Sequence, residues 1–285
     1  MNAAPPSDGN HLKEPDFRRL AQFIEGYCGI RMPPAKKTLV EGRLRRRVRA
    51  LGLADINQYC RYLFDQDGLH FETVHLIDAV TTNKTEFFRE AEHFDLLTDL
   101  ALPDMLAGHE RVGLDRPLKV WSAACSTGAE PYTLAIVLQE FSQALRGFRF
   151  SILGTDICTN VLAQAKLAIY PEDMILPVPP AYRQRYFLRS RDPAAAKVRV
   201  TPTIRQMVHF GRLNLMESSY PVDQMDVIFC RNILIYFEKQ TQEEVLQRLC
   251  ERLRPGGYLF VGHTETLTGM SLPLKQAATS VFVRK

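Results

Sequence analysis

The chain has 285 residues, 46% of them apolar and 24% charged, and its formal net charge is +4 at pH 7. These values are ordinary for a globular protein of two domains, or of one large and one small domain, and they exclude disorder as the main state. No segment is long and apolar enough to span a bilayer, and residues 1–11 lack the features of a signal peptide, so we expect a soluble, cytoplasmic protein.

The six cysteines are spread widely along the chain, and no pair has the Cys-x-x-Cys spacing of a zinc or redox site. Several lie inside apolar runs, which favours buried free thiols in a reducing compartment over disulfides. We therefore expect no metal site. The six are Cys28, Cys60, Cys125, Cys158, Cys230 and Cys250.

Residues 12–80 are predicted to form a small all-helical domain. Apolar side chains recur there at steps of three and four, first from Phe17 to Ile24 and again from Val40 to Leu51. This spacing is typical of helices that bury one face.

The second of these helices is strongly basic. Residues 31–50 contain eight Lys or Arg and a single acid, Glu41. One interpretation is that these side chains form an ordinary solvated face without a binding role. A run of arginines without interleaved acids instead favours a docking surface for an acidic partner. Nucleic acid is an alternative partner, although the stretch has no aromatic side chain on which a base could stack. The candidate docking residues are Arg43, Arg46, Arg47 and Arg49.

Residues 81–110 are predicted to be a linker that also contacts a cofactor. The segment begins with TTNKTEFFRE, in which Asn83, Thr85 and Arg89 surround two phenylalanines that can fix it in a core. A polar segment held in this way can line a cleft. An interdomain turn with helix-capping residues is the alternative.

Residues 111–285 are predicted to form an α/β domain with a mostly parallel sheet covered on both faces, because apolar runs alternate with helical patterns. Between 171 and 206 six prolines surround a short strand-like KVRVT, which predicts a small inserted β-subdomain containing a hairpin. The predicted strands are 118–124, 150–155, 226–230 and 257–262, and the predicted helices are about 130–145, 159–169 and 240–253.

The first of these strands runs into a turn of small residues that opens a helix, WSAACSTGAEPY. The second ends in Asp156, and a carboxylate there can accept hydrogen bonds from both hydroxyls of a ribose. The turn has one glycine, Gly128, followed by Glu130, and this composition disfavours a pyrophosphate. A cofactor with a ribose, a cationic end and no phosphate suits it, and S-adenosylmethionine (SAM) is such a cofactor. On these segments alone, other nucleotide-type enzymes stay open.

The third strand continues into CRNILIYF. Arg231 and Asn232 follow it directly, at the end of the strand where open α/β sheets place their ligands. Tyr236 comes shortly afterwards, and a core aromatic with its hydroxyl at the surface is its alternative interpretation. The RPGG at 254–257 predicts the end of the last helix and the start of the fourth strand. His263 is interpreted as a turn or packing residue rather than as a base.

The chain resembles the chemotaxis receptor glutamate methyltransferases, the CheR family, over residues 12–284. The resemblance rests on TNKTEFFRE, WSAACSTGAEPYTLA, GTDI, NLME, FCRNILIYF and RPGGYLFVGHTE, in the order and spacing of that family. Of these, TNKTEFFRE and CRNILIYF carry the specific signals. The resemblance implies a Rossmann-like class I methyltransferase domain with a small inserted β-subdomain, preceded by a small all-helical N-terminal domain.

The resemblance also implies an activity, which is transfer of methyl from SAM to glutamate side chains of chemoreceptors during chemotactic adaptation. Arg89 and Tyr236 would lie beside the transferring methyl group, and the basic helix would meet the acidic cytoplasmic helices of the receptor. The loop at 192–197 lacks the glycines of members that grip a receptor's C-terminal pentapeptide, so a tether at the β-subdomain stays open. The implied SAM-binding residues are Asn83, Thr85, Arg89, Glu130, Asp156, Asn214, Leu215, Arg231 and Asn232.

Two other functions stay open at this point. A methyltransferase acting on nucleic acid would bind polynucleotide with a steep salt dependence. A non-catalytic SAM-binding regulator would dock on signalling proteins without turnover, although Arg89 and Tyr236 favour catalysis. We expect a monomer with no nucleic-acid partner and no membrane insertion.

Overall fold

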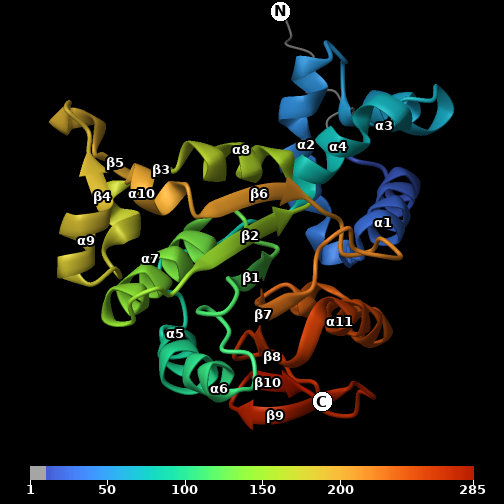
Figure 1. The fold of residues 1–285 in the computed structure, drawn as a ribbon. Coiled ribbons are helices and arrows are strands. Elements are labelled where there is room, and N and C mark those ends of the chain that lie inside the picture. The colour runs from blue at the N-terminus through green and yellow to red at the C-terminus, as the bar shows by residue number, and fades with distance from the viewer. Residues whose placement is uncertain (1–10) are drawn as a thin grey trace, which may run out of the picture. The chain divides into compact units, whose positions relative to one another are not determined.

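The computed structural model describes residues 11–285 (Figure 1). The expectation about residues 1–11 therefore lies, apart from His11, outside the described range. The chain divides into a helical unit that ends at Thr82 and also includes Tyr236–Glu238, and a larger unit formed by Asn83–Ile235 and Lys239–Lys285. Among the described residues, no helix has the length and apolar character needed to cross a membrane.

The helical unit confirms the predicted all-helical N-terminal domain. Phe17, Leu20 and Ile24 form one buried stripe, and Val40 and Leu44 form the next, so the predicted apolar spacing faces the core. Its helices are α1 (Glu14–Cys28), α2 (Lys37–Ala50), α3 (Ile56–Asp65) and α4 (Leu69–Val80), with a short 3₁₀ turn, η2 (Pro34–Lys36), before α2.

Two arginines of α2 tie this helix to α4. Arg47 donates hydrogen bonds to both carboxylate oxygens of Glu72, at 2.6 and 2.5 Å, and the Glu72 side chain is only 2% exposed. Arg43 donates to the carbonyl oxygens of Val80 and Thr81 and so satisfies the end of α4. Because carbonyls at a helix end have no partner within the helix, an arginine placed there stabilises it.

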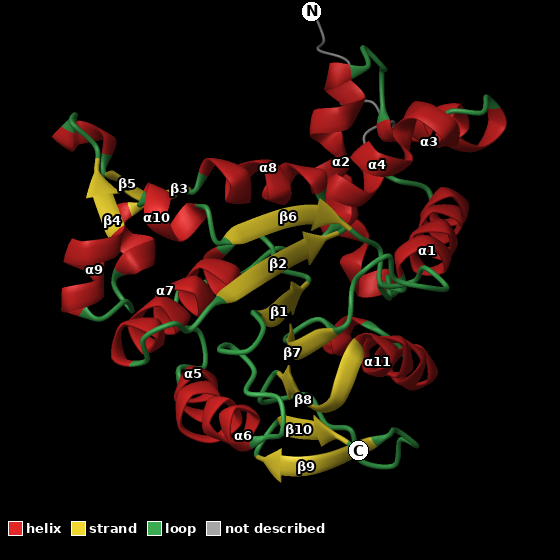
Figure 2. Cartoon of the chain, in the orientation of Figure 1, coloured by secondary structure: helices red, strands yellow, loops and turns green. Residues whose placement is uncertain are grey.

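The larger unit confirms the predicted Rossmann-like fold. Its seven-stranded sheet has the order β6-β2-β1-β7-β8-β10-β9; the first five strands run parallel, and β10 is antiparallel to both of its neighbours (Figure 2). The strands are β1 (Leu118–Ala123), β2 (Phe150–Asp156), β6 (Val208–Arg212), β7 (Met225–Cys230), β8 (Leu253–Val261), β9 (Leu274–Ala278) and β10 (Val281–Arg284).

Helices cover this sheet where the sequence predicted them. The helices α7 (Ala129–Ala144) and α8 (Thr159–Leu167) pack against strands of the β1, β2 and β6 group, and α11 (Lys239–Arg252) packs on β8. Every residue of the central strand β7 is buried, which shows that both of its faces are covered, as parallel sheets require.

The predicted insertion is a separate sheet of three strands rather than one hairpin. The antiparallel order is β3-β5-β4, with β3 (Ile169–Pro171), β4 (Phe187–Arg189) and β5 (Lys197–Val200). The connections contain the short helices η4 (Glu172–Ile175), α9 (Pro180–Tyr186) and η5 (Pro193–Ala195), and α10 (Pro202–Arg205) follows β5. Strands of three residues carry almost no alternation, which is why only β5 was visible in the sequence.

Three strands of the main sheet and the helices of the linker were not predicted. The strand β6 reads VHFGR, with glycine and charge diluting its apolar residues. The strand β9 is mostly exposed, and β10 has only four residues. The linker contains α5 (Glu92–Leu96), a π-helical turn η3 (Leu97–Ala101) and α6 (Leu102–Ala107). The RPGG motif lies inside β8, and α11 ends two residues before it, at Arg252.

Candidate functional site

The carboxyl ends of β1, β2 and β7 form the edge of the sheet where this fold places ligands. From β1 the chain proceeds outward through β2 to β6 on one side, and then through β7 to β8 on the other side. This reversal between β1 and β7 is a topological switch point. Glu130 opens α7 after β1, Asp156 ends β2, and Arg231 follows β7, so the fold places these three predicted residues on one edge.

The turn after β1 has an unusual backbone. Ala124 and Ser126 have φ of 60° and 52°, and Gly128 has φ of 89°. A side chain at Gly128 would bring its Cβ to 2.9 Å from the Cβ of Ala165, so only glycine fits. Non-glycine residues in the left-handed region carry strain, and such residues concentrate at functional sites.

Asp156 is held in place by this turn. Its Oδ2 accepts a hydrogen bond from the backbone N of Ser126 at 2.8 Å, and its Oδ1 accepts from the backbone N of Cys158 at 2.9 Å. The residue is 7% exposed. These bonds orient the Asp156 carboxylate at the end of β2, beside the turn.

The segment that begins at Asn83 lies against the same turn. The hydroxyl of Ser126 donates to the carbonyl oxygen of Asn83 at 2.8 Å, and the Asn83 amide donates to Sγ of Cys158 at 3.6 Å. The loop after β6 approaches Asp156 as well, because the backbone N of Leu213 donates to the Asp156 carbonyl at 3.0 Å. Asn214 is the next residue, and the structure thus brings the segments of both asparagines to Asp156.

Arg231 connects three of the predicted site segments. Its side chain is 1% exposed and donates to Oε2 of Glu130 at 3.0 Å, to the backbone carbonyl of Arg89, and to Oε2 of Glu90 at 3.1 Å. The guanidinium also lies 5.6 Å from the ring centre of Phe94. Because a guanidinium offers five donors in a rigid plane, it can hold these groups in one arrangement.

Glu90 is a member of this site that sequence reasoning missed. It accepts from Arg231, from Nδ2 of Asn232 at 3.0 Å and from the backbone N of His263 at 3.2 Å. Burial alone would raise the pKa of Glu90, but the hydrogen bond from Asn232 and the charge of Arg231 outweigh it and lower the pKa to about 2. Glu90 is therefore a carboxylate at neutral pH. It directly follows Arg89 in the sequence, but its partners are more than 140 positions away.

Glu265 was also missed, and it fixes the backbone of the segment after β7. Its carboxylate accepts from the backbone N of Gly262 at 2.6 Å, of Asn232 at 2.9 Å and of Leu234 at 2.7 Å. Asn232 has φ of 57°, so the chain turns sharply at this point. Burial raises the pKa of Glu265, and these backbone donors act in the opposite direction.

The remaining predicted site residues lie in different settings. Thr85 and Arg89 are half-buried, and the Arg89 guanidinium donates to the carbonyl of Lys84 at 3.2 Å. Leu215, implied by the resemblance, is buried in the loop after β6. Tyr236 belongs to the helical unit, so its place beside Arg89 stays a prediction.

Within that unit, Tyr236 has two basic neighbours. The backbone N of Arg31 donates to its carbonyl oxygen at 3.1 Å, and the Lys36 ammonium lies 5.6 Å from the centre of its ring. Tyr236 closes the 3₁₀ turn η6 (Leu234–Tyr236).

The predicted docking arginines fall into two groups. Arg46 and Arg49 are exposed, and so is Arg45, which lies between them and Arg43 in the sequence. Arg43 and Arg47 are engaged with α4, as described above. Spacing along the helix does not reveal this difference, because Glu72 and the end of α4 lie more than 20 positions away.

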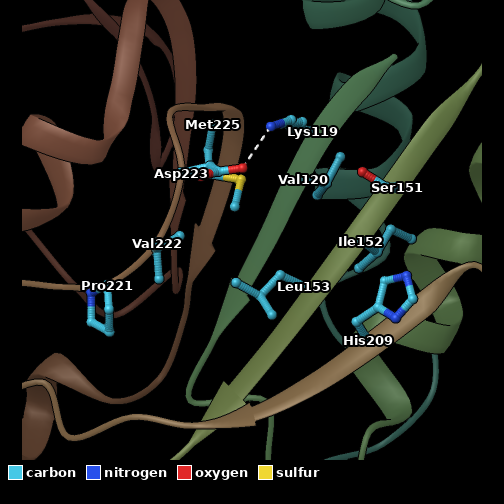
Figure 3. A pocket seen from close by; sticks show the side chains of 10 residues that line it. All are labelled: Lys119, Val120, Ser151, Ile152, Leu153, His209, Pro221, Val222, Asp223 and Met225. Atoms are coloured by element: carbon cyan, nitrogen blue, oxygen red, sulfur yellow. Dashed lines mark hydrogen bonds and ion pairs between the residues drawn. The ribbon is translucent and has the colours of Figure 1, made fainter.

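A separate pocket lies at the opposite edge of the sheet (Figure 3). It has a volume of about 350 Å³ and contains the ion pair between Lys119 and Asp223, at 2.8 Å. Its lining comes from the N-terminal parts of β1, β2, β6 and β7 and from residues 221–223 before β7, and it includes none of the predicted site residues. The pocket therefore lies apart from the residues that are predicted to bind the cofactor.

The carboxyl edge offers hydrogen-bonding groups rather than a nucleophile. The nearby thiols of Cys125 and Cys230 are buried, and burial raises the pKa of each well above its usual range. A thiol of this kind is inert at neutral pH. The arrangement suits a reaction in which a bound donor and an already ionised acceptor are brought into line.

Comparison with known proteins agrees with this geometry. The family model described as CheR methyltransferase, all-alpha domain, matches residues 15–81, and the model described as CheR methyltransferase, SAM binding domain, matches residues 83–283. Chemotaxis protein methyltransferase 2 of Pseudomonas aeruginosa is 38% identical over 95% of this chain and 94% of its own length. The chemotaxis protein methyltransferase of Salmonella typhimurium is 40% identical over 91% of this chain and 86% of its own length. That of Escherichia coli is 40% identical over 90% and 86%.

Proposed function

Because the chain belongs to the CheR methyltransferase family, we propose that it methylates specific glutamate side chains of chemoreceptors for adaptation in bacterial chemotaxis. The chain is a SAM-dependent methyltransferase. The proposed substrate is a receptor glutamate, and the proposed product is its γ-methyl ester. The observation that supports it best is the hydrogen-bonding of Arg231 to Glu130, Glu90 and the backbone of Arg89, since this cluster joins the family's two specific motifs in one site.

The proposed cofactor contacts follow from this site. When bound, SAM supplies an electrophilic methyl group on a sulfonium. Asp156 would bind the ribose hydroxyls, while Arg231 and Glu130 hold the turn and the linker segment around the cofactor. The full proposed set is Asn83, Thr85, Arg89, Glu130, Asp156, Asn214, Leu215, Arg231 and Asn232.

The acceptor needs no general base. A glutamate with an unperturbed pKa near 4.3 is ionised at neutral pH, so its carboxylate is ready to attack. The residues therefore act by placing it in line and excluding water. We propose that Arg89 orients cofactor and substrate without clamping the attacking oxygen, because a tight ion pair would reduce its nucleophilicity. The Tyr236 hydroxyl would fix the carboxylate by one neutral hydrogen bond.

This role of Tyr236 predicts a selective defect. Tyr236→Phe should lower kcat by about 2- to 10-fold, the equivalent of one neutral hydrogen bond of about 0.5–1.5 kcal/mol, and leave SAM affinity nearly unchanged. Methyl-transfer assays and calorimetry with SAM would measure the two effects. Tyr62→Phe, a half-buried tyrosine of the same unit, is the control. A large loss of SAM affinity in Tyr236→Phe would contradict the proposed role.

We propose that the exposed arginines of α2 meet the acidic cytoplasmic helices of the receptor. Charge reversal at Arg46 and Arg49 together should raise KM for receptor by about tenfold at low salt and less at 0.15 M, because exposed charges are screened. SAM affinity should not change. Arg61→Glu, an exposed position on α3, is the matched control. An equal rise in KM for that control would remove the docking role from α2.

The β-subdomain is the proposed place for a receptor C-terminal tether. In its sheet β4 is an edge strand, and an edge strand can pair with an extended peptide. A pocket of about 800 Å³ beside it is lined by residues that include Leu176, Phe187 and Arg189.

We propose that the chain is organised as an N-terminal helical domain (12–80), a linker that contacts the cofactor (81–110) and a methyltransferase domain (111–285). We further propose that it is a monomer and that it works in the cytoplasm, where the receptor helices lie.

The direct test is transfer of radiolabelled methyl from SAM to receptor-containing membranes, followed by mild alkali. Label on the receptor that is released as volatile methanol would establish carboxyl methylation. If SAM binds but no receptor from the same cell becomes labelled, the proposed substrate is wrong, and polynucleotides are the next substrates to try.

A further inference from the structure

Two histidines and a glutamate form a cluster next to the Arg231 network. Glu90, His93 and His263 each offer one ligand atom, and these atoms all lie within 4.8 Å of one another. Nδ1 of His93 is 3.5 Å from Oε2 of Glu90, and Nε2 of His263 is 4.0 Å from the same oxygen.

These separations are close to those of a metal site. In a tetrahedral zinc site with bonds of 2.0–2.2 Å, neighbouring ligand atoms are about 3.3–3.6 Å apart. The separation of 3.5 Å between His93 and Glu90 already lies in this range, and the separation of 4.0 Å between His263 and Glu90 would have to shorten by about 0.4–0.7 Å. The two histidine nitrogens, which lie within 4.8 Å of each other, would also have to approach.

His93 is a buried side chain without hydrogen bonds. It is 0% exposed, and neither ring nitrogen forms a hydrogen bond with any part of the chain that the structure describes. Buried polar atoms nearly always have a partner, so this exception calls for an explanation. A metal ion bonded to a ring nitrogen of His93 would supply the missing partner.

The other side of the cluster is open to solvent. The His263 side chain is 38% exposed, and its ring centre lies 4.6 Å from that of His93. Glu92, whose side chain is 83% exposed, has its Oε2 3.8 Å from Nε2 of His263. An ion can therefore reach the cluster from solvent, and the Glu92 carboxylate lies on the side from which the ion would approach.

We propose that Glu90, His93 and His263 bind a divalent transition-metal ion, with Glu92 or water as the fourth ligand. Two imidazoles and a carboxylate suit Zn²⁺, whereas Mg²⁺ and Ca²⁺ prefer sites made of oxygen alone. The cysteine spacing predicted no metal site, but the ligands proposed here are two histidines and a glutamate. Here, about 170 positions separate His93 from His263, so only the fold brings them together.

Binding of the ion should weaken binding of SAM, an effect that rests on the proposed function. Oε2 of Glu90 is also the acceptor for Arg231, which is a proposed SAM-binding residue. A metal on this oxygen would compete with that hydrogen bond. By linkage, SAM would weaken metal affinity by the same factor.

The first experiment titrates Zn²⁺ into the full chain in a calorimeter, in the absence of SAM and with any histidine tag removed. We expect one ion per chain. We also expect His263→Ala to bind the ion at least about tenfold more weakly, since losing a residue that only hydrogen-bonds to a metal ligand already reduces metal affinity by about 10- to 100-fold. His109→Ala, an exposed histidine outside the cluster, should bind like the wild type. His263 is partly exposed, so its variant should fold, and circular dichroism would check this. Undiminished binding by His263→Ala, or no binding by the wild type, would overturn the site.

The second experiment measures SAM affinity with and without saturating Zn²⁺. A several-fold loss in the wild type that is absent in His263→Ala would support the coupling. Stoichiometric Zn²⁺ binding with unchanged SAM affinity would overturn the coupling. Failure to bind SAM without any metal would instead count against the proposed function.

Discussion

Arg231→Met is expected to lower the free energy of unfolding by about 3–5 kcal/mol and to remove most SAM binding, because breaking one side of a buried ion pair leaves the other side uncompensated. Methionine fills a similar volume, so packing is largely preserved. The carboxylates of Glu130 and Glu90, which are 14% and 16% exposed, would lose their common partner. The turn, the linker segment and the strand end would then no longer be held in one arrangement.

Urea unfolding and calorimetry with SAM would measure these two effects. Arg254→Met is the matched control, because Arg254 is 39% exposed and lies 3.6 Å from Asp226, which keeps its bidentate bonds to Arg116. We expect that control to lose less than about 1 kcal/mol. A folded Arg231→Met protein with wild-type SAM affinity would exclude Arg231 from the cofactor site.

Asp156→Ala is expected to weaken SAM binding at least tenfold. Two charge-assisted hydrogen bonds to a ribose are each worth about 1.5–3 kcal/mol, and the variant would lose both. It would also release the backbone donors of Ser126 and Cys158, which Asp156 now holds. The loss should therefore appear mainly in SAM affinity, with a smaller loss of stability from the relaxed turn.

Calorimetry with SAM would test this directly. Asp223→Ala removes a carboxylate from the pocket at the opposite edge of the sheet, and it should leave SAM affinity unchanged. If Asp156→Ala bound SAM as tightly as the wild type, the ribose would have to be placed elsewhere.

The sequence predicted those parts of the fold whose pattern is local. The strands β1, β2, β7 and β8 are apolar runs, and α7, α8 and α11 lie within a few residues of their predicted limits. The strand β6 was missed because His209 and Gly211 interrupt its apolar residues. These two residues are tolerated there because β6 is an outermost strand of the sheet. Local patterns also cannot show that the insertion has three strands, because β3 and β4 have three residues each.

The same limit applies to the site. Motifs pointed to Asp156, Glu130 and Arg231, since each stands at a strand end or a helix start. They did not point to Glu90 or Glu265, whose importance depends on partners that only the folded chain brings close. Residue type alone likewise could not separate the arginines that stabilise α2 from those that remain exposed.

The six cysteines have a practical consequence for experiments on this protein. All are free and buried, and burial raises the pKa of Cys28 and Cys250 to about 11 and that of Cys60 to about 12. The folded chain should therefore react slowly with maleimides. A cysteine introduced at an exposed position outside the docking surface, such as Arg61→Cys, would accept a fluorophore selectively. Receptor encounters could then be followed by energy transfer without first removing the native thiols.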